Sequence, residues 1–151
     1  MPTVSRCCWQ KVSSCGTPAK SGSLAAQPEQ PELLYESALL AEKLGRQDVL
    51  ETNLRKLIRI KPDHAHAYNA LGYSLAERNQ RLAEAEQLIA KALQLSPDDP
   101  FITDSMGWVL FKLGDYSTAR DYLERAYRLE AEAEIAAHLV DARWQLGERD
   151  S

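Results

Sequence analysis

The 151-residue sequence has little cysteine and few aromatic residues. Its three cysteines, Cys7, Cys8 and Cys15, all lie among the first 30 residues. Residues 31–151 contain none, which excludes disulfides and cysteine-ligated metals as stabilising elements there. Val, Ile and Thr are also scarce beside Ala, Leu and Glu, and this balance favours helix over strand. These shortages predict an all-α chain that is stabilised by side-chain packing.

Basic residues do not outnumber acidic ones in the sequence. The net charge is −4 at pH 7, whereas nucleic-acid binding requires clustered Lys and Arg. The charge is unevenly divided, because residues 1–30 carry +2 and the remaining residues carry −6. No stretch approaches the roughly 18 consecutive apolar residues of a membrane span. We therefore expect neither a nucleic-acid partner nor a membrane-spanning helix.

Residues 1–30 show no apolar periodicity and are rich in Ser, Pro, Gln, Gly and Thr. Such a segment buries too little apolar surface to offset the entropy of ordering it, so we expect a disordered tail. Two alternatives stay open. Residues 12–15, VSSC, followed by Gly16 fit the short pattern before a lipidated cysteine, although the apolar stretch of ~7–15 residues that a leader needs is missing. A wrongly assigned start or an added tail sequence would explain the segment equally well.

From Pro31 onward the chain repeats itself. An amphipathic helix, a short polar turn and a second amphipathic helix recur, with small residues at fixed offsets. Aligned on the residue where paired helices approach most closely, the register runs Ala38, Gly72, Gly107, Val140. The spacings are 34, 35 and 33 residues. A helix-turn-helix unit of ~34 residues is typical of tetratricopeptide repeats.

The sequence resembles the tetratricopeptide-repeat (TPR) family over its helical part. The second and third repeats carry the resemblance best, through Tyr68, Leu71, Gly72, Leu75, Ala85, Ile89, Ala92 and Pro97, and then Met106, Gly107, Leu110, Leu113, Gly114, Tyr116, Ala119, Leu123 and Ala126. The resemblance implies a right-handed helical solenoid over residues 31–151. The expected solenoid consists of three repeats, about 31–64, 65–99 and 100–132, and a capping helix over about 133–146.

Single residues predict how the helices begin, turn and end. Asp99 and Pro100 are typical of a helix start. Gly45 and Gly114 stand where the chain must turn with a left-handed residue. The turn over 77–82 lacks a glycine, so a wider loop is expected there. Val140 replaces the small contact residue, which predicts that no second helix packs tightly on the last helix.

In a TPR solenoid the first helix of each repeat lines the concave side. One stripe of these helices is expected to face the groove and to bind a partner, through Tyr35, His66, Asn69, Tyr73, Asp104, Trp108, Phe111 and Trp144. Aromatic anchors of this kind suit an apolar helix or an extended peptide, and Asn69 suits a ligand backbone. Tyr73 and Trp108 are expected to touch the ligand, and Phe111 and Trp144 to pack between repeats. The alternative is that the rings only seal neighbouring repeats against each other.

Other chemistry finds little support in the sequence. The histidines His64, His66 and His138 lack a neighbouring nucleophile or a third metal ligand, and we interpret them as solvated or helix-capping residues. No glycine-rich phosphate loop is present. The chain is therefore expected to have no catalytic residues, metal, cofactor or small-molecule substrate. Some TPR domains grip a terminal carboxylate with Lys, Arg and Asn, but only Lys43 and Lys112 stand near this groove, so such a clamp is not expected.

A closer resemblance is to the C-terminal repeats of proteobacterial TPR proteins, including lipoproteins that act as protease adaptors. It is carried by LLYESALLAEKLGR, NALGYSLAER, SPDDPFITDSMGWVLFKLGDY and EIAAHLVDARWQLG. It implies a scaffold for a peptide or protein, in envelope protein processing or assembly. The compartment it implies is periplasmic or outer-membrane-associated, or cytoplasmic if the leader is truly missing. The alternative function is a self-association module in which terminal helices pair with another copy, which an exposed Trp144 would favour.

Overall fold

A computed structural model describes residues 30–148 of the protein. The expected disordered tail over residues 1–30 lies outside the described residues except for Gln30, as do the cysteines. The described part is helical and contains no strand. Its elements are α2 (Pro31–Lys43), α3 (Gln47–Ile60), α4 (Ala65–Glu77), α5 (Leu82–Leu95), α6 (Pro100–Leu113), α7 (Tyr116–Leu129) and α8 (Ala133–Gln145). The predicted all-α class is confirmed.

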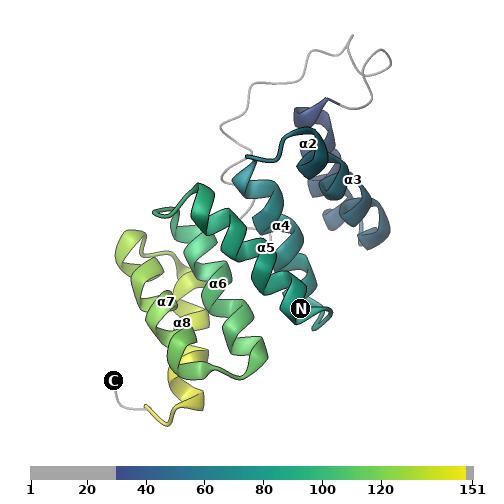
Figure 1. The fold of residues 1–151 in the computed structure, drawn as a ribbon. Coiled ribbons are helices and arrows are strands. Elements are labelled where there is room, and N and C mark those ends of the chain that lie inside the picture. Colours follow the sequence, from purple (N-terminus) through teal and green to yellow (C-terminus); the bar gives the residue numbers. More distant parts are fainter. Residues whose placement is uncertain (1–29, 149–151) are drawn as a thin grey trace.

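The helices form consecutive pairs that follow one another along a stack. Helix α2 packs on α3, α4 on α5 and α6 on α7, and α8 then packs on both α7 and α6 (Figure 1). First helices also contact first helices of the next repeat, since α4 contacts α6 and α6 contacts α8. Such contacts place side chains from different repeats on one wall. Among the described residues, no helix is long and apolar enough to cross a membrane.

The two helix glycines lie where paired helices approach most closely. A Cβ atom added to Gly72 would stand 2.6 Å from Cγ1 of Ile89 and 2.9 Å from the backbone oxygen of Ala85. A Cβ atom on Gly107 would stand 2.6 Å from Cγ of Leu123. At the same register, Val140 is 61% exposed, so no second helix covers it within the described chain. The predicted register is confirmed by these contacts.

The turns also follow the prediction. Gly45 and Gly114 take left-handed φ angles of +72° and +93°. The loop between α4 and α5 extends over residues 78–81, against 114–115 between α6 and α7, so the wider loop is confirmed. Asn79 and Arg81 supply its left-handed residues, with φ of 56° and 46°. A longer loop thus replaces the single glycine turn.

Side-chain acceptors cap the starts of α4, α6 and α7, and the start of α6 is the one that Asp99 and Pro100 indicate in the sequence. The Asp99 carboxylate accepts hydrogen bonds from the backbone N–H groups of Phe101 and Ile102, and Pro100 begins α6. Asp115 caps α7 in the same way by accepting from Thr118. These bonds satisfy amides that have no partner inside the helix.

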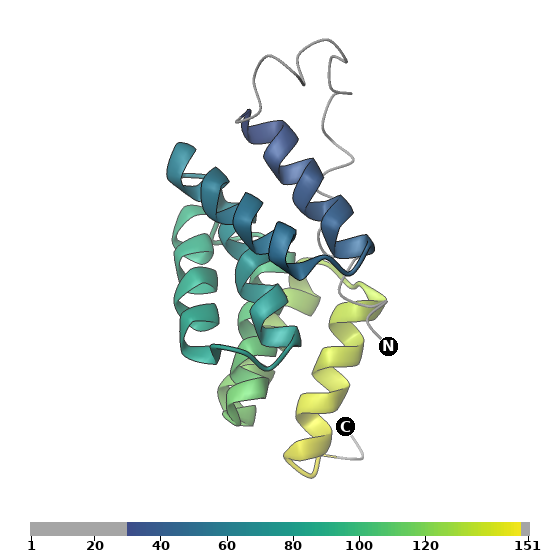
Figure 2. The same ribbon diagram turned by 90° about the vertical axis from the view of Figure 1, so that its right-hand side faces the viewer.

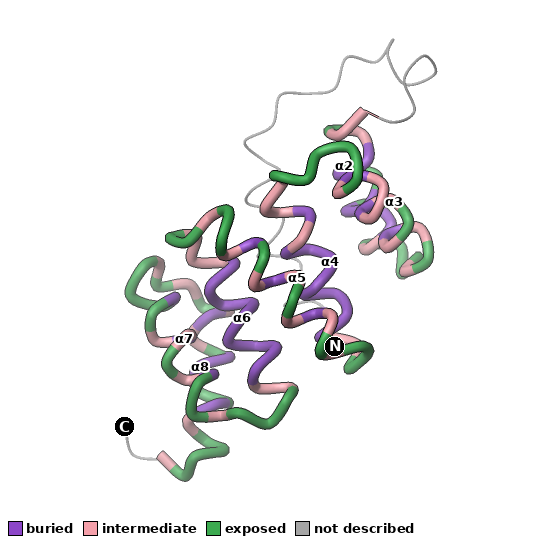
Figure 3. Tube along the Cα trace, in the orientation of Figure 1, coloured by how far each residue is buried: buried purple, intermediate pink, exposed green. Residues whose placement is uncertain are grey.

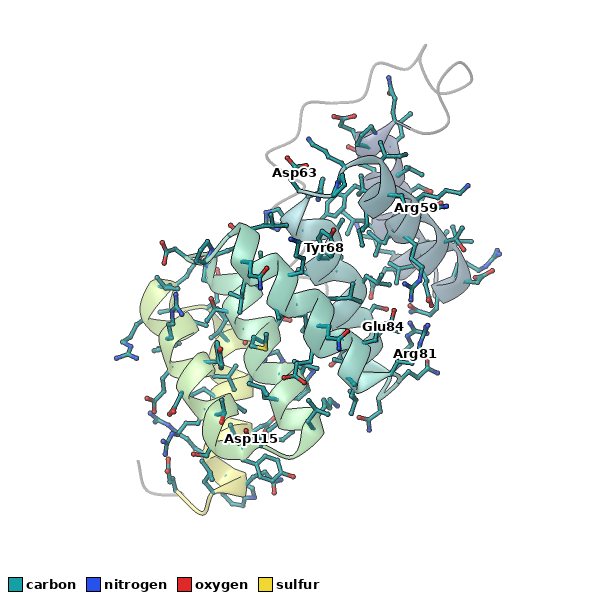
Figure 4. The ribbon with its side chains drawn as sticks, in the orientation of Figure 1. Arg59, Asp63, Tyr68, Arg81, Glu84 and Asp115 are labelled. Carbon is teal, nitrogen blue, oxygen red and sulfur yellow. The ribbon has the colours of Figure 1, made fainter. Side chains whose placement is uncertain are left out.

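Burial differs between first and second helices (Figure 3). Helices α4 and α6 are buried along nearly their whole length, because each lies between its own second helix and the neighbouring repeats. Helices α3, α5 and α7 bury one stripe and expose the rest. Their exposed sides carry charge: Arg55 and Arg81 bridge Glu51 on α3 and Glu84 on α5. Arg81 and Glu84 lie side by side at that edge of the molecule (Figure 4).

Candidate protein-binding groove

Trp108 on α6 is the centre of an aromatic cluster between first helices. Its ring stacks on the His138 imidazole at a centroid distance of 4.2 Å and on Phe111 at 5.0 Å. The Lys112 ammonium lies 4.7 Å from the Trp108 ring centroid, a cation–π contact. The indole N–H donates to the Glu77 carboxylate of α4 at 2.7 Å. Three first helices, α4, α6 and α8, therefore hold this one side chain.

Beside Trp108, a buried ion pair joins α6 to α8. Nδ1 of His138 lies 2.9 Å and 3.1 Å from the two carboxylate oxygens of Asp104, and the side chains are 5% and 0% exposed. The Tyr73 ring lies 6.4 Å from the imidazole. Burial by itself lowers the pKa of His138, but the charge and hydrogen bond of Asp104 outweigh it, with Glu134 and Glu77 adding to the effect. The pKa of His138 is therefore raised.

A second cluster lies at the other end of the groove stripe, around the start of α4. The Tyr35 ring of α2 lies 5.2 Å from His64, which caps α4, and Nε2 of His66 lies 3.8 Å from the Asp99 carboxylate. Burial raises the pKa of Tyr35, and the charge of Asp99 raises it further. Burial lowers the pKa values of both histidines, although Asp99 opposes this for His66. Burial thus favours neutral imidazoles and an un-ionised phenol in this cluster.

Asn69 lies between the two clusters along α4, one turn before Tyr73. It is 3% exposed, and its side-chain oxygen is buried without a hydrogen-bond partner. A buried amide oxygen without a donor costs about 1–3 kcal/mol. Its oxygen is thus an unpaired acceptor enclosed in the stack, out of reach of a partner in this conformation.

The accessible part of the stripe lies towards the C-terminal end. Trp144 is 55% exposed on α8, and Asp141 beside it is exposed as well. Phe111 is half-buried at the edge of the Trp108 cluster. These side chains, rather than the buried rings beneath them, form the accessible surface of the stripe.

The burial of three sets of side chains differs from expectation. Tyr73 and Trp108 were expected to touch a ligand, but they are only 1% and 9% exposed, while Trp144, expected to pack between repeats, is 55% exposed. The reason is that α4 and α6 are enclosed by neighbouring helices, whereas no further repeat covers α8 among the described residues. His138 is not solvated, since it pairs with Asp104 inside the stack.

The structure brings four predicted residues into one cluster: Tyr73, Asp104, Trp108 and Phe111. Tyr35 and His66 belong to the second cluster, and Trp144 stands on the exposed face of α8. Two residues of the first cluster, Glu77 and His138, were missed. His138 follows Asp104 by 34 residues, one repeat period, and this spacing is the signal that would have found it.

The ring faces and carboxylates of the clusters make contacts between repeats inside the stack. Within residues 30–148, no three His, Cys, Asp or Glu side chains come together to hold a metal ion. The accessible rings of the stripe, Trp144 and part of Phe111, are of the kind that commonly anchors a bound peptide.

Comparison with known proteins gives concordant likenesses. The family model described as tetratricopeptide repeat matches residues 63–132. A TPR repeat-containing protein of Pseudomonas aeruginosa is 47% identical over 116 residues, covering 77% of this chain but 20% of that protein. The chain thus spans a fifth of the length of that relative.

Solved structures share the fold. A thermophilic TPR protein of Thermus thermophilus has a TM-score of 0.74 at 25% identity, covering 85% of this chain and 71% of that one. The first TPR domain of Spaghetti (RPAP3) has a TM-score of 0.72 at 21% identity, covering 79% and 97%. With the repeat period and the glycine contacts described above, these likenesses establish that the chain belongs to the tetratricopeptide-repeat family.

Proposed function

We propose that this chain is a protein-binding scaffold without catalytic residues, which holds a peptide segment of a partner protein along the wall formed by α2, α4, α6 and α8. The observation that carries the proposal is the Trp108 cluster, in which side chains from three first helices converge. Contacts between groups 31 and 34 residues apart join neighbouring repeats, so the cluster fixes the shape of the wall on which the more accessible Phe111 and Trp144 rings stand. A TPR fold in itself suits protein–protein interaction.

In this proposal the predicted groove residues divide into two kinds. Phe111 and Trp144 contact the partner directly, since they are accessible. Asp104, Trp108 and Tyr73 lie beneath and fix the shape of the wall. Asn69 is buried as well and belongs with these supporting residues, and the Tyr35 and His66 cluster extends the wall towards α2.

The partner segment is proposed to be apolar rather than a charged C-terminus. The first TPR domain of RPAP3 was solved with the acidic HSP90 peptide SRMEEVD. Here Lys112 is already engaged on the Trp108 ring, and Glu77 and Asp141 add negative charge to the wall. Carboxylates beside carboxylates repel, so an acidic peptide is disfavoured.

The biological setting rests on family likeness. The resemblance to proteobacterial protease adaptors, together with the Pseudomonas relative, supports a role in envelope protein processing or assembly. Because that relative is much longer, its whole activity is not transferred to this chain.

Affinity capture from a proteobacterial lysate tests the proposal. The full chain serves as bait beside a Phe111→Ala, Trp144→Ala double variant and a Tyr127→Ala control, which removes a 41% exposed ring from α7 instead. We expect a partner that wild type and control retain and the still-helical double variant loses. A partner held equally by all three baits would show that this wall is not the binding surface.

A second function is favoured by the open face of α8. Val140 and Trp144 are 61% and 55% exposed on that helix, which suits pairing with a second copy. Sedimentation at increasing protein concentration tests it, with Val140→Lys as the variant. A mass that rises with concentration for the wild type and not for Val140→Lys would support self-association; a constant monomer mass would exclude it.

A further inference from the structure

We infer that Asp104 and His138 form a pH-responsive clasp that holds α8 against α6: α8 is held firmly while the imidazole is protonated and more loosely once it is neutral. The clasp is this pair of side chains. Its consequence for partner binding rests on the function proposed above, but the clasp itself does not.

The clasp connects α6 of the third repeat to α8, which follows that repeat. The pair spans 34 residues of sequence, at 2.9 Å, with both side chains inside the protein. The imidazole also stacks on Trp108 at 4.2 Å, so it contacts α6 twice. A buried pair of this kind is costly when one partner loses its charge, because the other charge then stays in a poorly solvated site.

The charged groups that act on His138 are carboxylates, and they come from three helices. Asp104 comes from α6, Glu77 from α4 and Glu134 from α8 itself, and each favours the charged imidazolium. Tyr73 of α4 adds a ring at 6.4 Å and no charge. On the side of α7, Glu124 pairs with Arg143 of α8 at 2.8 Å. Loss of the imidazolium proton would therefore leave three carboxylates around a neutral ring.

The direction of the pH effect follows from the raised pKa of His138. In the unfolded chain a histidine titrates near about 6.5. A group whose folded pKa is higher contributes its full stabilisation below the unfolded value and loses it as pH rises through the folded pKa. The clasp is thus strongest at mildly acidic pH and weakens from about neutral pH upward.

Helix α8 is the element that responds, because within residues 30–148 it is packed on one side only. It contacts α6 and α7 and stands at the edge of the stack (Figure 2), and its Val140 and Trp144 side chains are exposed. An element with few neighbours opens locally at lower cost than the enclosed helices α4 and α6. Opening of α8 would separate His138 from Trp108 and so change the shape of the proposed groove.

Two measurements on the full chain without any partner test the clasp. The first is an NMR titration of the His138 ring, for which we expect a midpoint above that of an unfolded-chain histidine. The second is amide hydrogen exchange of α8 at about pH 6 and about pH 8, corrected for intrinsic rates. We expect the opening constant of α8 to be larger at the higher pH, by up to about tenfold for each unit by which the titration midpoint of His138 exceeds that of an unfolded-chain histidine, with no comparable change in α4.

Variants separate the clasp from a general pH effect. His138→Gln keeps a hydrogen-bond donor but does not titrate, so the opening of its α8 should no longer depend on pH; His66→Gln is the matched control and should behave as the wild type. A His138 midpoint at or below the unfolded value, or equal pH dependence in wild type and His138→Gln, would overturn the clasp. If His138→Gln does not fold, the wild-type titration decides alone. Because no partner is present, failure here leaves the proposed function standing, and a failed capture experiment leaves the clasp standing.

Discussion

Adding one methyl group at Gly107 tests the helix contact on which the repeat register depends. The new Cβ atom would lie 2.6 Å from Cγ and 2.8 Å from Cδ2 of Leu123, whereas ordinary contacts begin at 3.4 Å. Leu123 must therefore withdraw by about 0.8 Å, although it is 0% exposed and protein interiors are close-packed. The Ala119 carbonyl oxygen, 3.2 Å away, prevents the methyl group from moving aside.

The magnitude results from two opposed effects. Overpacking of a buried site costs typically 1–3 kcal/mol, and the full burial of Leu123 argues for the upper end. Alanine in place of glycine inside a helix contributes about 1 kcal/mol in the other direction. We therefore expect Gly107→Ala to lower the free energy of unfolding by about 1–2 kcal/mol, measured by urea denaturation with far-UV circular dichroism.

A double-mutant cycle with Leu123→Ala isolates the contact. Leu123→Ala alone should cost about 2–5 kcal/mol, because it leaves a cavity. In the double variant the methyl group added at position 107 no longer meets the leucine side chain. The decrease in the free energy of unfolding should therefore be smaller than the sum of the two single decreases, by roughly 1 kcal/mol or more. Additive losses, or a Gly107→Ala variant stabilised by its helix propensity, would refute the contact and with it the register.

Three further outcomes are expected from the same denaturation measurements. Trp108→Ala should lower the free energy of unfolding by about 3 kcal/mol, since it removes a buried ring with contacts to three helices. Trp144→Ala should change the free energy of unfolding by less than about 0.5 kcal/mol, because that ring is exposed. Equal losses would mean that both rings are equally exposed. Asp99→Ala should cost about 1 kcal/mol through the lost cap of α6, with Asp99→Asn close to wild type. Gly114→Ala should cost about 1 kcal/mol because of its φ of +93° alone, as nothing lies within 4 Å of the added methyl group; an unchanged midpoint would show that this turn relaxes.

Helix positions followed from the sequence because they depend on local rules. Asp99 and Pro100 indicated the start of α6, and Gly114 its end, through cap and turn chemistry that acts within a few residues. The register of Gly72 and Gly107 followed from the repeat period, since every repeat packs its two helices in the same way.

The groove stripe was harder to predict, because the burial of its side chains depends on other repeats. The sequence indicates that Tyr73, Trp108 and Trp144 lie on first helices, but only the stack decides that the first two are enclosed and the third is exposed. His138 illustrates the same difficulty: from its neighbours in sequence it looked like a solvated residue, yet the packing of α8 on α6 places it against Asp104.

The sequence by itself therefore determined the helices, their turns, the repeat period and the TPR family, because propensity, capping and the small contact residues act within one repeat. Tertiary structure alone decided which rings are accessible, that Glu77 and His138 belong to the Trp108 cluster, and that Asp104 and His138 form a buried pair between repeats. Those properties arise where one repeat stacks on the next, and they depend on how far each first helix is enclosed by helices distant in the sequence.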